Sequence, residues 1–225
     1  MRYRLRWAKR GKLRYVSHHD EALIFERSFR RAGLPLRYSN GFSAHPKIAF
    51  GSGLPVGYGS EVELMDVGLT RPLDPDAIVT TCNEGLPSGL QILGAAALPP
   101  GVPSLGSTIA AADYRVTTSQ PWVAEMLDWF LGLDSYEITR PYKGAERTDD
   151  VRAGVLGARA TEGGFCVRTR LKPRAVRPAD MFAAMGTKAG ATDPAATFER
   201  VALLASAGDD LITMTESSIM WEVAG

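Results

Sequence analysis

Hydrophobic and basic residues alternate along residues 2–16, and this period of two predicts extended structure. One parity holds the aromatic residues and leucines, at Tyr3, Leu5, Trp7, Leu13 and Tyr15. The other parity holds basic residues, at Arg2, Arg4, Arg6, Lys12 and Arg14. We therefore expect an apolar face and a row of arginines on opposite sides of the segment, with a turn at residues 9–11.

Residues 18–32 are predicted to form a helix, because Ser17 and Asp20 have the spacing of a capping box. The side chains expected to be buried are Ala22, Leu23, Ile24, Phe25 and Phe29. Gly33, followed two residues later by Pro35, ends the helix. The arginines of its last turns suit the negative end of the helix dipole.

The rest of the first half follows an alternating order of strands and helices. A short strand is expected at 47–50, a strand at 61–69, a helix at 74–84 and a strand at 90–97. This is the β-α-β-β-α-β order of a ferredoxin-like unit. Prolines and a glycine at residues 99–103 then suggest a linker.

A similar order recurs after the linker. Strands are expected at 113–118, 135–140, 151–159, 165–171 and 199–205, helices at 121–131 and 178–186, and strands or an ordered tail at 211–223. We therefore predict an α+β fold of two tandem ferredoxin-like units. The expected domains are a basic N-terminal domain at 1–105 and a C-terminal domain with a tail at 110–225.

Charge changes this picture, because the net charge of +1 hides a strong asymmetry. Residues 1–50 carry 12 Lys and Arg but only Asp20, Glu21 and Glu26, a net of +9, which leaves −8 for the rest of the chain. A basic segment of this kind indicates an anionic partner, most simply nucleic acid. The alternative is that the basic half docks on the acidic half.

Composition excludes several kinds of chemistry. The two cysteines, Cys82 and Cys166, cannot supply an iron–sulfur cluster, and zinc-binding spacing and a P-loop motif are absent from the sequence. We expect no metal and no cofactor. No run of about 18 apolar residues occurs, and no apolar segment follows the basic start. We therefore expect a cytoplasmic protein without a membrane partner.

The three histidines all lie in residues 18–45, and three interpretations of them stay open. They have structural roles beside the helix cap, they line a polynucleotide-binding cleft, or His18 or His19 works with His45 in acid–base chemistry without a metal. Asp20 joins His18 and His45 as a candidate catalytic residue. Joint metal binding by His18 and His19 is awkward, because neighbouring helical residues point about 100° apart.

Cations interleaved with aromatic rings are typical of sites for single-stranded RNA, where cations hold phosphates and rings stack on bases. The candidate nucleic-acid-binding residues are Arg2, Arg4, Arg6, Arg27, Arg30, Arg31, Arg37, Tyr38, Phe42, His45 and Lys47. Glu61, Glu63 and Asp66 form an acidic cluster, for which we expect a solvated face or pairing with the arginine row.

The stretch from Ser17 to Asp66 resembles the radical SAM-linked (radical SAM-associated) proteins that carry the DUF2344 domain. The matching residues are Ser17-His18, Asp20, Arg27, Arg30-Arg31-Ala32-Gly33-Leu34-Pro35, Tyr38-Ser39, Gly41-Phe42, His45-Pro46, Phe50, Leu54-Pro55-Val56-Gly57, Ser60, Glu63 and Asp66. His19 and Glu21 depart from the family, which more usually has leucine at both positions. This favours His18, Asp20 and His45 over His19.

The resemblance implies a partner rather than a reaction. Members occur fused to, or encoded beside, cobalamin-binding radical SAM proteins, and in some bacteria near ribonuclease E/G genes. We therefore expect an accessory module that binds tRNA or rRNA and acts with a radical SAM enzyme in RNA modification or processing. The alternatives are a metal-independent RNA endonuclease or modifying enzyme using His18 and His45, and a protein-only scaffold for the radical SAM partner.

Overall fold

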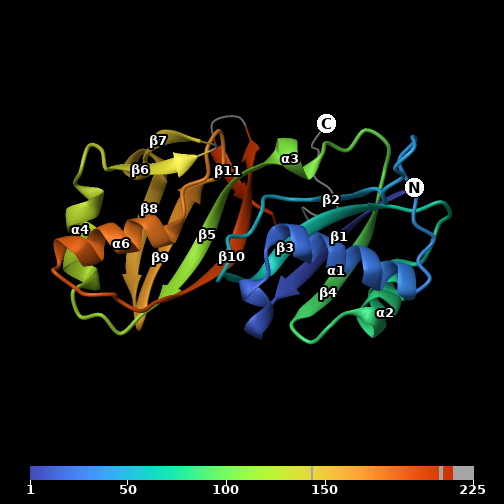
Figure 1. Ribbon diagram of the computed structural model, residues 1–225, viewed down its shortest axis with the longest axis horizontal. Coiled ribbons are helices and arrows are strands. Elements are labelled where there is room, and N and C mark those ends of the chain that lie inside the picture. Colours follow the sequence, from blue (N-terminus) through green and yellow to red (C-terminus); the bar gives the residue numbers. More distant parts are fainter. Residues whose placement is uncertain (143, 208–209, 215–225) are drawn as a thin grey trace. The chain divides into compact units, whose positions relative to one another are not determined.

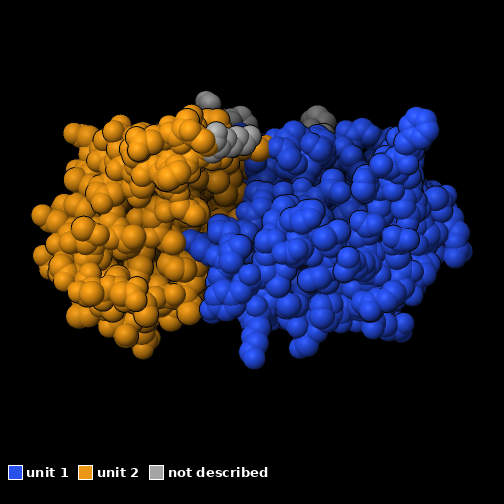
Figure 2. Space-filling view, in the orientation of Figure 1, with its two compact units in different colours: residues 1–109, 203–225 blue, residues 110–202 orange. Residues whose placement is uncertain are grey.

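The computed structural model describes residues 1–142, 144–207 and 210–214, and its fold is α+β with mostly antiparallel strands. The chain forms two compact units (Figure 2). Unit 1 comprises Met1–Ile109 together with the chain from Leu203 onward, and unit 2 comprises Ala110–Ala202.

Both units contain strands with helices between them along the chain (Figure 1). Unit 1 holds β1 (Arg2–Lys9), the 3-10 helix η1 (Gly11–Tyr15), α1 (His18–Arg31), β2 (Ile48–Phe50), β3 (Gly59–Gly68), α2 (Pro75–Gly85), β4 (Leu90–Leu98), α3 (Leu105–Thr108) and β11 (Asp210–Thr213). After β5 (Ile109–Thr117), unit 2 holds α4 (Val123–Leu131), β6 (Glu137–Tyr142), β7 (Ala145–Asp150), α5 (Val151–Gly154), β8 (Val155–Thr161), β9 (Gly164–Arg170) and α6 (Pro178–Lys188). The strand β10 (Thr197–Ala207) runs from unit 2 into unit 1.

The sheet of unit 1 has β1 at its centre, paired antiparallel with β3 and with β4. The short β2 pairs with the other edge of β3. The predicted apolar parity of β1 is confirmed, because Tyr3, Leu5 and Trp7 are buried in one core with Phe25 and Phe29 of α1. Alternate residues of a strand point to opposite faces, so this parity fixes which face of the sheet α1 covers.

The ends of α1 are those predicted from the sequence. The Ser17 Oγ accepts a hydrogen bond from the Asp20 backbone N–H, which caps the first turn. Gly33 follows the helix with φ of +72°, a conformation that glycine adopts without steric cost. The helix therefore presents His18 at its first turn and its arginines near its last turn.

Two sequence predictions for unit 1 need correction. Residues 12–15 are not extended, because Gly11, with φ of +58°, starts the 3-10 helix η1. Arg4 does not belong to an exposed arginine row, because the opposite face of β1 is also covered and Arg4 is only 4% exposed.

In unit 2, β5, β9 and β8 form an antiparallel sheet, and β6 pairs with β7 in a separate two-stranded sheet. The sequence predicts β6 but not β7. It also extends a strand over Val151–Gly154, which is the short helix α5 with Asp150 as its cap. The predicted segment 211–223 overlaps β11, and its part beyond residue 214 lies outside the described residues.

Candidate functional site

The chain between Arg37 and Lys47 folds back on itself as a short two-armed loop, called here the 37–47 loop. The Lys47 N–H donates to the Arg37 carbonyl at 2.7 Å, and Tyr38 forms a β-bridge with Pro46. Both arms are tied to the end of β3, since the Arg37 N–H donates to the Gly68 carbonyl and the Gly68 N–H donates to the Lys47 carbonyl, each at 2.8 Å. The base of the loop is therefore fixed to the sheet.

Aromatic rings and an imidazole project from this loop. Phe42 lies in its turn and is fully exposed, and Tyr38 is 39% exposed. His45 is also exposed, and its backbone N–H donates to the Ser39 Oγ at 3.1 Å. Gly41 precedes Phe42 with φ of +126°, a conformation that residues with a side chain rarely adopt. The loop therefore presents rings to solvent from a defined backbone.

Cations lie at the base of the 37–47 loop. Arg37 and Lys47 are exposed and line a cavity of about 920 Å³ together with Arg2 and Asp66. Among the residues that the structure describes, no ion pair or side-chain hydrogen bond engages Arg37 or Lys47. Two positive charges are thus available beside the exposed rings.

The acidic cluster of β3 neutralises part of the β1 arginine row. Asp66 binds Arg4 through two hydrogen bonds of 2.7 and 3.0 Å, and both residues are buried. The Arg2 guanidinium contacts the Val102 carbonyl and lies 3.9 Å from the Asp66 carboxylate. Glu61 pairs with Arg10 at 2.7 Å. The expected pairing with the arginine row is confirmed for Asp66, whereas Glu61 pairs with Arg10, which lies outside that row. Arg4 is removed from the candidate RNA contacts because its side chain is enclosed.

The arginines of α1 lie on an exposed part of the helix. Arg27, Arg30 and Arg31 line a hollow of about 870 Å³ beside residues 85–87. Arg30 lies 3.5 Å from Glu26 in an exposed pair, and such pairs contribute little binding energy. Arg31 donates to the Gly85 carbonyl at 3.2 Å. These side chains remain accessible to an anionic partner.

His18 belongs to a second polar cluster, which it forms with Lys9 and Glu21. The Lys9 ammonium lies 2.7 Å from one Glu21 carboxylate oxygen, and these two side chains are at most 2% exposed. The Lys9 Nζ also donates to the Val16 carbonyl at 2.9 Å. The other Glu21 oxygen lies 3.2 Å from the His18 Nδ1. A buried ion pair therefore holds one side of the His18 imidazole.

The hydrogen bond to Glu21 raises the pKa of His18 above its usual value, and burial acts in the opposite direction. The charge of Glu63 also raises it, whereas the charge of Lys9 lowers it. The His18 ring meets Phe50 edge-on with centroids 5.2 Å apart. With Nδ1 held by a carboxylate, Nε2 is the ring atom that can exchange a proton with a ligand.

The structure separates the remaining catalytic candidates from His18. Arg2 pairs with Gly68 and Lys9 with Ser60, so His18 lies near one end of β1 and the 37–47 loop near the other. The His18 ring contacts Glu21 and Phe50, whereas His45 bonds Ser39 through its backbone, and within the described residues no hydrogen bond joins the two histidines. His18 and His45 therefore do not contact each other directly. Asp20 accepts a hydrogen bond from Ser17 at 2.7 Å, which gives it a role in the helix cap.

Sequence reasoning missed Lys9 and Glu21, although the pattern contained a signal for both. Lys9 has the same parity as the inward residues of β1, and Glu21 lies four residues before Phe25 and eight before Phe29. Each charge therefore occupies a position that its element directs into the core. Two opposite charges at inward positions of neighbouring elements indicate a buried pair.

Within the described residues, no three His, Cys, Asp or Glu side chains lie together as a metal site would require. None of the described helices has the length and apolar character needed to span a bilayer. A comparison with curated proteins finds no match. A family model described as uncharacterized protein conserved in bacteria (DUF2344) matches residues 2–180, which is most of the chain. Together with the ordered motifs from Ser17 to Asp66, this match shows that the chain belongs to the DUF2344 family.

Proposed function

We propose that the chain is an RNA-binding module that contacts unpaired nucleotides with the 37–47 loop. The observation that supports this function is the exposure of Tyr38 and Phe42 beside Arg37 and Lys47. Stacking of a base on an aromatic side chain contributes about 1–3 kcal/mol, and neighbouring cations hold the phosphates. A fully exposed Phe42 gains this contact only when a partner covers it.

Single-stranded RNA fits this loop better than a duplex does. Bases in a helix are stacked on one another and are not accessible to a protruding ring, whereas bases in loops and at ends can be splayed out. His45 adds a side chain that can hydrogen-bond a base or a phosphate. The loops of tRNA or rRNA are therefore the proposed ligands.

The cellular role proposed here rests on the family resemblance. We propose that the chain is not catalytic on its own and presents RNA to a cobalamin-binding radical SAM protein in the cytoplasm, for modification or processing. A protein-only scaffold for the same enzyme is the competing role. Copurification of that enzyme without nucleic acid would favour the scaffold, because the RNA would then be dispensable.

We also propose that both units are ferredoxin-like. Unit 1 has the element order β1-α1-β2-β3-α2-β4 and the strand order β4-β1-β3-β2. Unit 2 has β5-α4-β8-β9-α6-β10, with the β6–β7 hairpin inserted after α4. We propose the domain bounds 1–105 and 110–225. The boundary between the two compact units lies near the same place, after Ile109, but the chain from Leu203 onward belongs to unit 1 and not to unit 2.

The test of RNA binding measures fluorescence anisotropy of labelled tRNA and single-stranded oligonucleotides between 50 and 200 mM salt. Phe42→Ala is expected to weaken binding roughly 5- to 150-fold, the loss of one stacked base. The matched control is Tyr15→Ala, since Tyr15 is also exposed but lies just beyond the Lys9 end of β1. Equal effects of the two substitutions, or affinity that does not change with salt, would refute the proposal.

Substitution of the two cations at the base of the 37–47 loop tests the same site independently. Arg37→Ala with Lys47→Ala is expected to lower the dependence of log K on log salt by about 0.7 for each lost phosphate contact. Lys12→Ala is the control for a charge removed elsewhere in unit 1, because Lys12 is exposed in η1. A slope equal to that of the wild type would exclude phosphate contacts at the base of the loop.

One observation favours a second function, acid–base chemistry on RNA at His18. The Glu21 carboxylate orients the imidazole, as a third group orients the base in many catalytic sites. The expected result is metal-independent cleavage or modification of RNA that is lost in His18→Gln while RNA affinity is retained. Unchanged RNA after long incubation with concentrated protein would exclude this function.

A further inference from the structure

The β6–β7 hairpin of unit 2 places two arginines directly opposite each other. Arg140 on β6 pairs in register with Arg147 on β7. Like charges at opposite positions of neighbouring strands destabilise a hairpin. Nearby carboxylates must therefore offset this repulsion, and Asp149 and Asp180 lie beside the two guanidinium groups.

Three of the four acids of the hairpin lie on the face opposite Arg140 and Arg147, and Asp149 lies on the same face as these arginines. Arg140 and Arg147 share one face with Tyr142, because side chains of a strand alternate with a period of two. Glu137, Glu146 and Asp150 have the opposite parity. Of these, Asp150 accepts hydrogen bonds from the backbone N–H groups of residues 136 and 153. Positive charge is thus separated from most of the negative charge of the hairpin.

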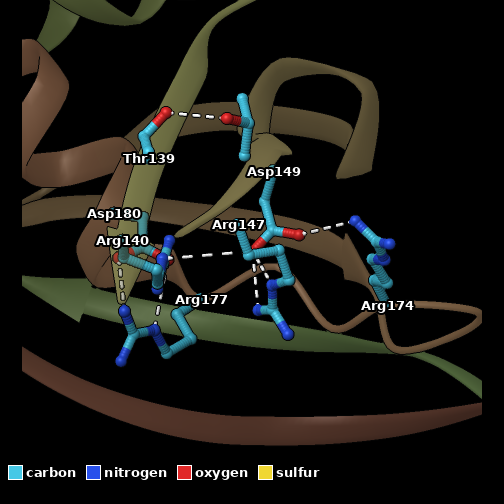
Figure 3. A network of polar contacts seen from close by, with 8 residues as sticks. Thr139, Arg140, Arg147, Asp149, Arg174, Arg177 and Asp180 are labelled. Carbon is cyan, nitrogen blue, oxygen red and sulfur yellow. Dashed lines mark hydrogen bonds and ion pairs between the residues drawn. The ribbon is translucent and has the colours of Figure 1, made fainter. Parts of the chain in front are cut away.

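Two carboxylates hold four guanidinium groups on the positive face (Figure 3). Asp149 lies 2.6 Å from Arg147 and 3.0 Å from Arg174. This pairing lowers the pKa of Asp149 and keeps it charged, although burial acts in the opposite direction.

Asp180, at the first turn of α6, completes the arrangement. It lies 3.1 Å from Arg140 and 2.9 Å from Arg177. Among these six side chains, the positive charges exceed the negative charges by two. The carboxylates fix the guanidinium groups in place.

Two arginines share each carboxylate, and one arginine of each two remains accessible to solvent. Arg174 is 64% exposed and Arg177 is 47% exposed, whereas their carboxylate partners are about 13–14% exposed. Arg174 contacts Asp149 through Nη1 alone, which leaves its other N–H groups directed at solvent. The Arg140 Nε is enclosed, makes no hydrogen bond within the described residues and lies 4.0 Å from the Asp149 carboxylate. The oxyanions of a ligand would therefore bond the exposed donors of Arg174 and not this enclosed one.

A ring adjoins the cations. The Arg147 guanidinium lies over the Tyr142 ring at 4.5 Å, and Tyr142 is exposed. A stacked guanidinium and ring present a flat surface of the kind on which nucleic-acid bases stack. A ligand with a phosphate and an adjacent base matches both features, whereas a bare anion uses only the first.

We infer that Arg140, Arg147, Arg174 and Arg177 form a phosphate-binding site in unit 2, with Tyr142 beside it for a base of the same RNA. The inference rests on the proposed function, since it adds a second RNA contact that is independent of the 37–47 loop. Arginine suits this role because its planar fork binds phosphate oxygens in pairs. The Asp149 and Asp180 pairs reduce the conformational entropy lost on binding, because the side chains are already ordered.

The test uses the full chain, labelled tRNA and anisotropy across the same salt range. Arg174→Ala with Arg177→Ala is expected to weaken binding roughly tenfold and to lower the salt slope by about 1.4, which is about 0.7 for each lost contact. Arg147 and Arg140 still pair with the two carboxylates in this variant, so unit 2 is expected to stay folded. Arg174→Lys with Arg177→Lys is expected to restore most of the salt slope but not the affinity, because it keeps charge without the planar fork.

The matched control is Arg159→Ala with Arg170→Ala, which removes two exposed arginines of unit 2 that lie outside the network. If the wild type binds RNA and this control weakens binding as much as the Arg174/Arg177 variant does, the site is refuted while the proposed function stands. If the wild type binds no RNA at 50 mM salt, the proposed function fails first. Thermal stabilisation by a phosphorylated peptide, lost in the Arg174/Arg177 variant, would then identify a protein ligand and overturn the assignment to RNA.

Discussion

The buried pair of Lys9 and Glu21 gives a sharp prediction for stability. Lys9→Met removes the ammonium and leaves the Glu21 carboxylate, which is 2% exposed, with His18 as its remaining charged contact in the cluster. Breaking a buried ion pair by removing one partner costs about 3–5 kcal/mol, because the other charge is left uncompensated. Since domains unfold with about 5–15 kcal/mol in total, this loss is a large fraction of the stability.

The neighbouring residue supplies the control. Arg10 pairs with Glu61 at the same 2.7 Å distance as Lys9 with Glu21, but these side chains are 45% and 54% exposed. Arg10→Met is therefore expected to cost at most about 1 kcal/mol. Urea denaturation followed by circular dichroism measures both variants, and equal m-values allow their midpoints to be compared.

A double variant separates the charge from the packing. Lys9→Met with Glu21→Leu removes both charges and is expected to be more stable than either single variant, because no uncompensated charge is left in the core. If Lys9→Met costs no more than Arg10→Met, or if the double variant loses the sum of the two single losses, the pair does not act as a buried ion pair and the reasoning fails.

Three further outcomes are expected. Because Glu21 raises the pKa of His18, the stability that His18 adds is complete below pH 6.5 and is lost as pH rises through the raised pKa. The free energy of unfolding of the wild type, from urea denaturation, should therefore exceed that of His18→Gln most at acid pH. A difference that stays constant up to pH 9 would contradict this. Gly154→Ala should cost about 1–3 kcal/mol, because its new Cβ would lie 2.1 Å from the Val176 Cγ2, whereas Gly157→Ala has open space and should cost less by the same denaturation measurement. Burial raises the pKa of Cys82 to about 12, so mass spectrometry should find Cys82 unalkylated by iodoacetamide at pH 8 until urea unfolds the chain, and rapid labelling of the folded protein would count against its burial.

Periodicity predicted those elements that bury one face. The strand at the N-terminus, the capped helix that follows it and the strand at residues 61–69 all have an apolar side that packs in the core of unit 1. Ser17, Asp74 and Gly33 mark helix ends through local hydrogen bonds or a local φ angle, which do not depend on the rest of the fold. For these reasons the sequence alone was sufficient to predict these elements and these helix ends.

Strand β7 shows why the remainder was not predictable. Its sequence, AERTDD, has no apolar alternation, and the strand is held by its register with β6 and by the ion pairs of Arg147 and Asp149. Strand β6 is adjacent in the chain, but Arg174, which pairs with Asp149, comes 25 residues later. A pattern of hydrophobicity contains no information on such pairing. The candidate site in unit 2 was missed for the same reason.

The charge count also led to a wrong prediction of the accessibility of Arg4 in β1. The net charge of +9 in residues 1–50 cannot show which cations are neutralised by acids further along the chain. Asp66 and Glu61 come from β3, which pairs with β1 in the same unit. Enclosed Arg4 is thereby removed from the accessible positive charge of unit 1, whereas the cations of the 37–47 loop and of α1 remain exposed.

Two arginine–aspartate arrangements in this chain lead to opposite conclusions, and the exposure of the side chains decides between them. In unit 1, Asp66 binds Arg4 through two hydrogen bonds and both side chains are enclosed, so this pair fixes packing, and only Arg2, 3.9 Å from the same carboxylate, is partly exposed. In unit 2, two carboxylates hold four guanidinium groups, of which two are largely exposed. Exposed guanidinium groups that are held in place by enclosed carboxylates are what the inferred phosphate-binding site requires, because a ligand reaches them without reordering their side chains.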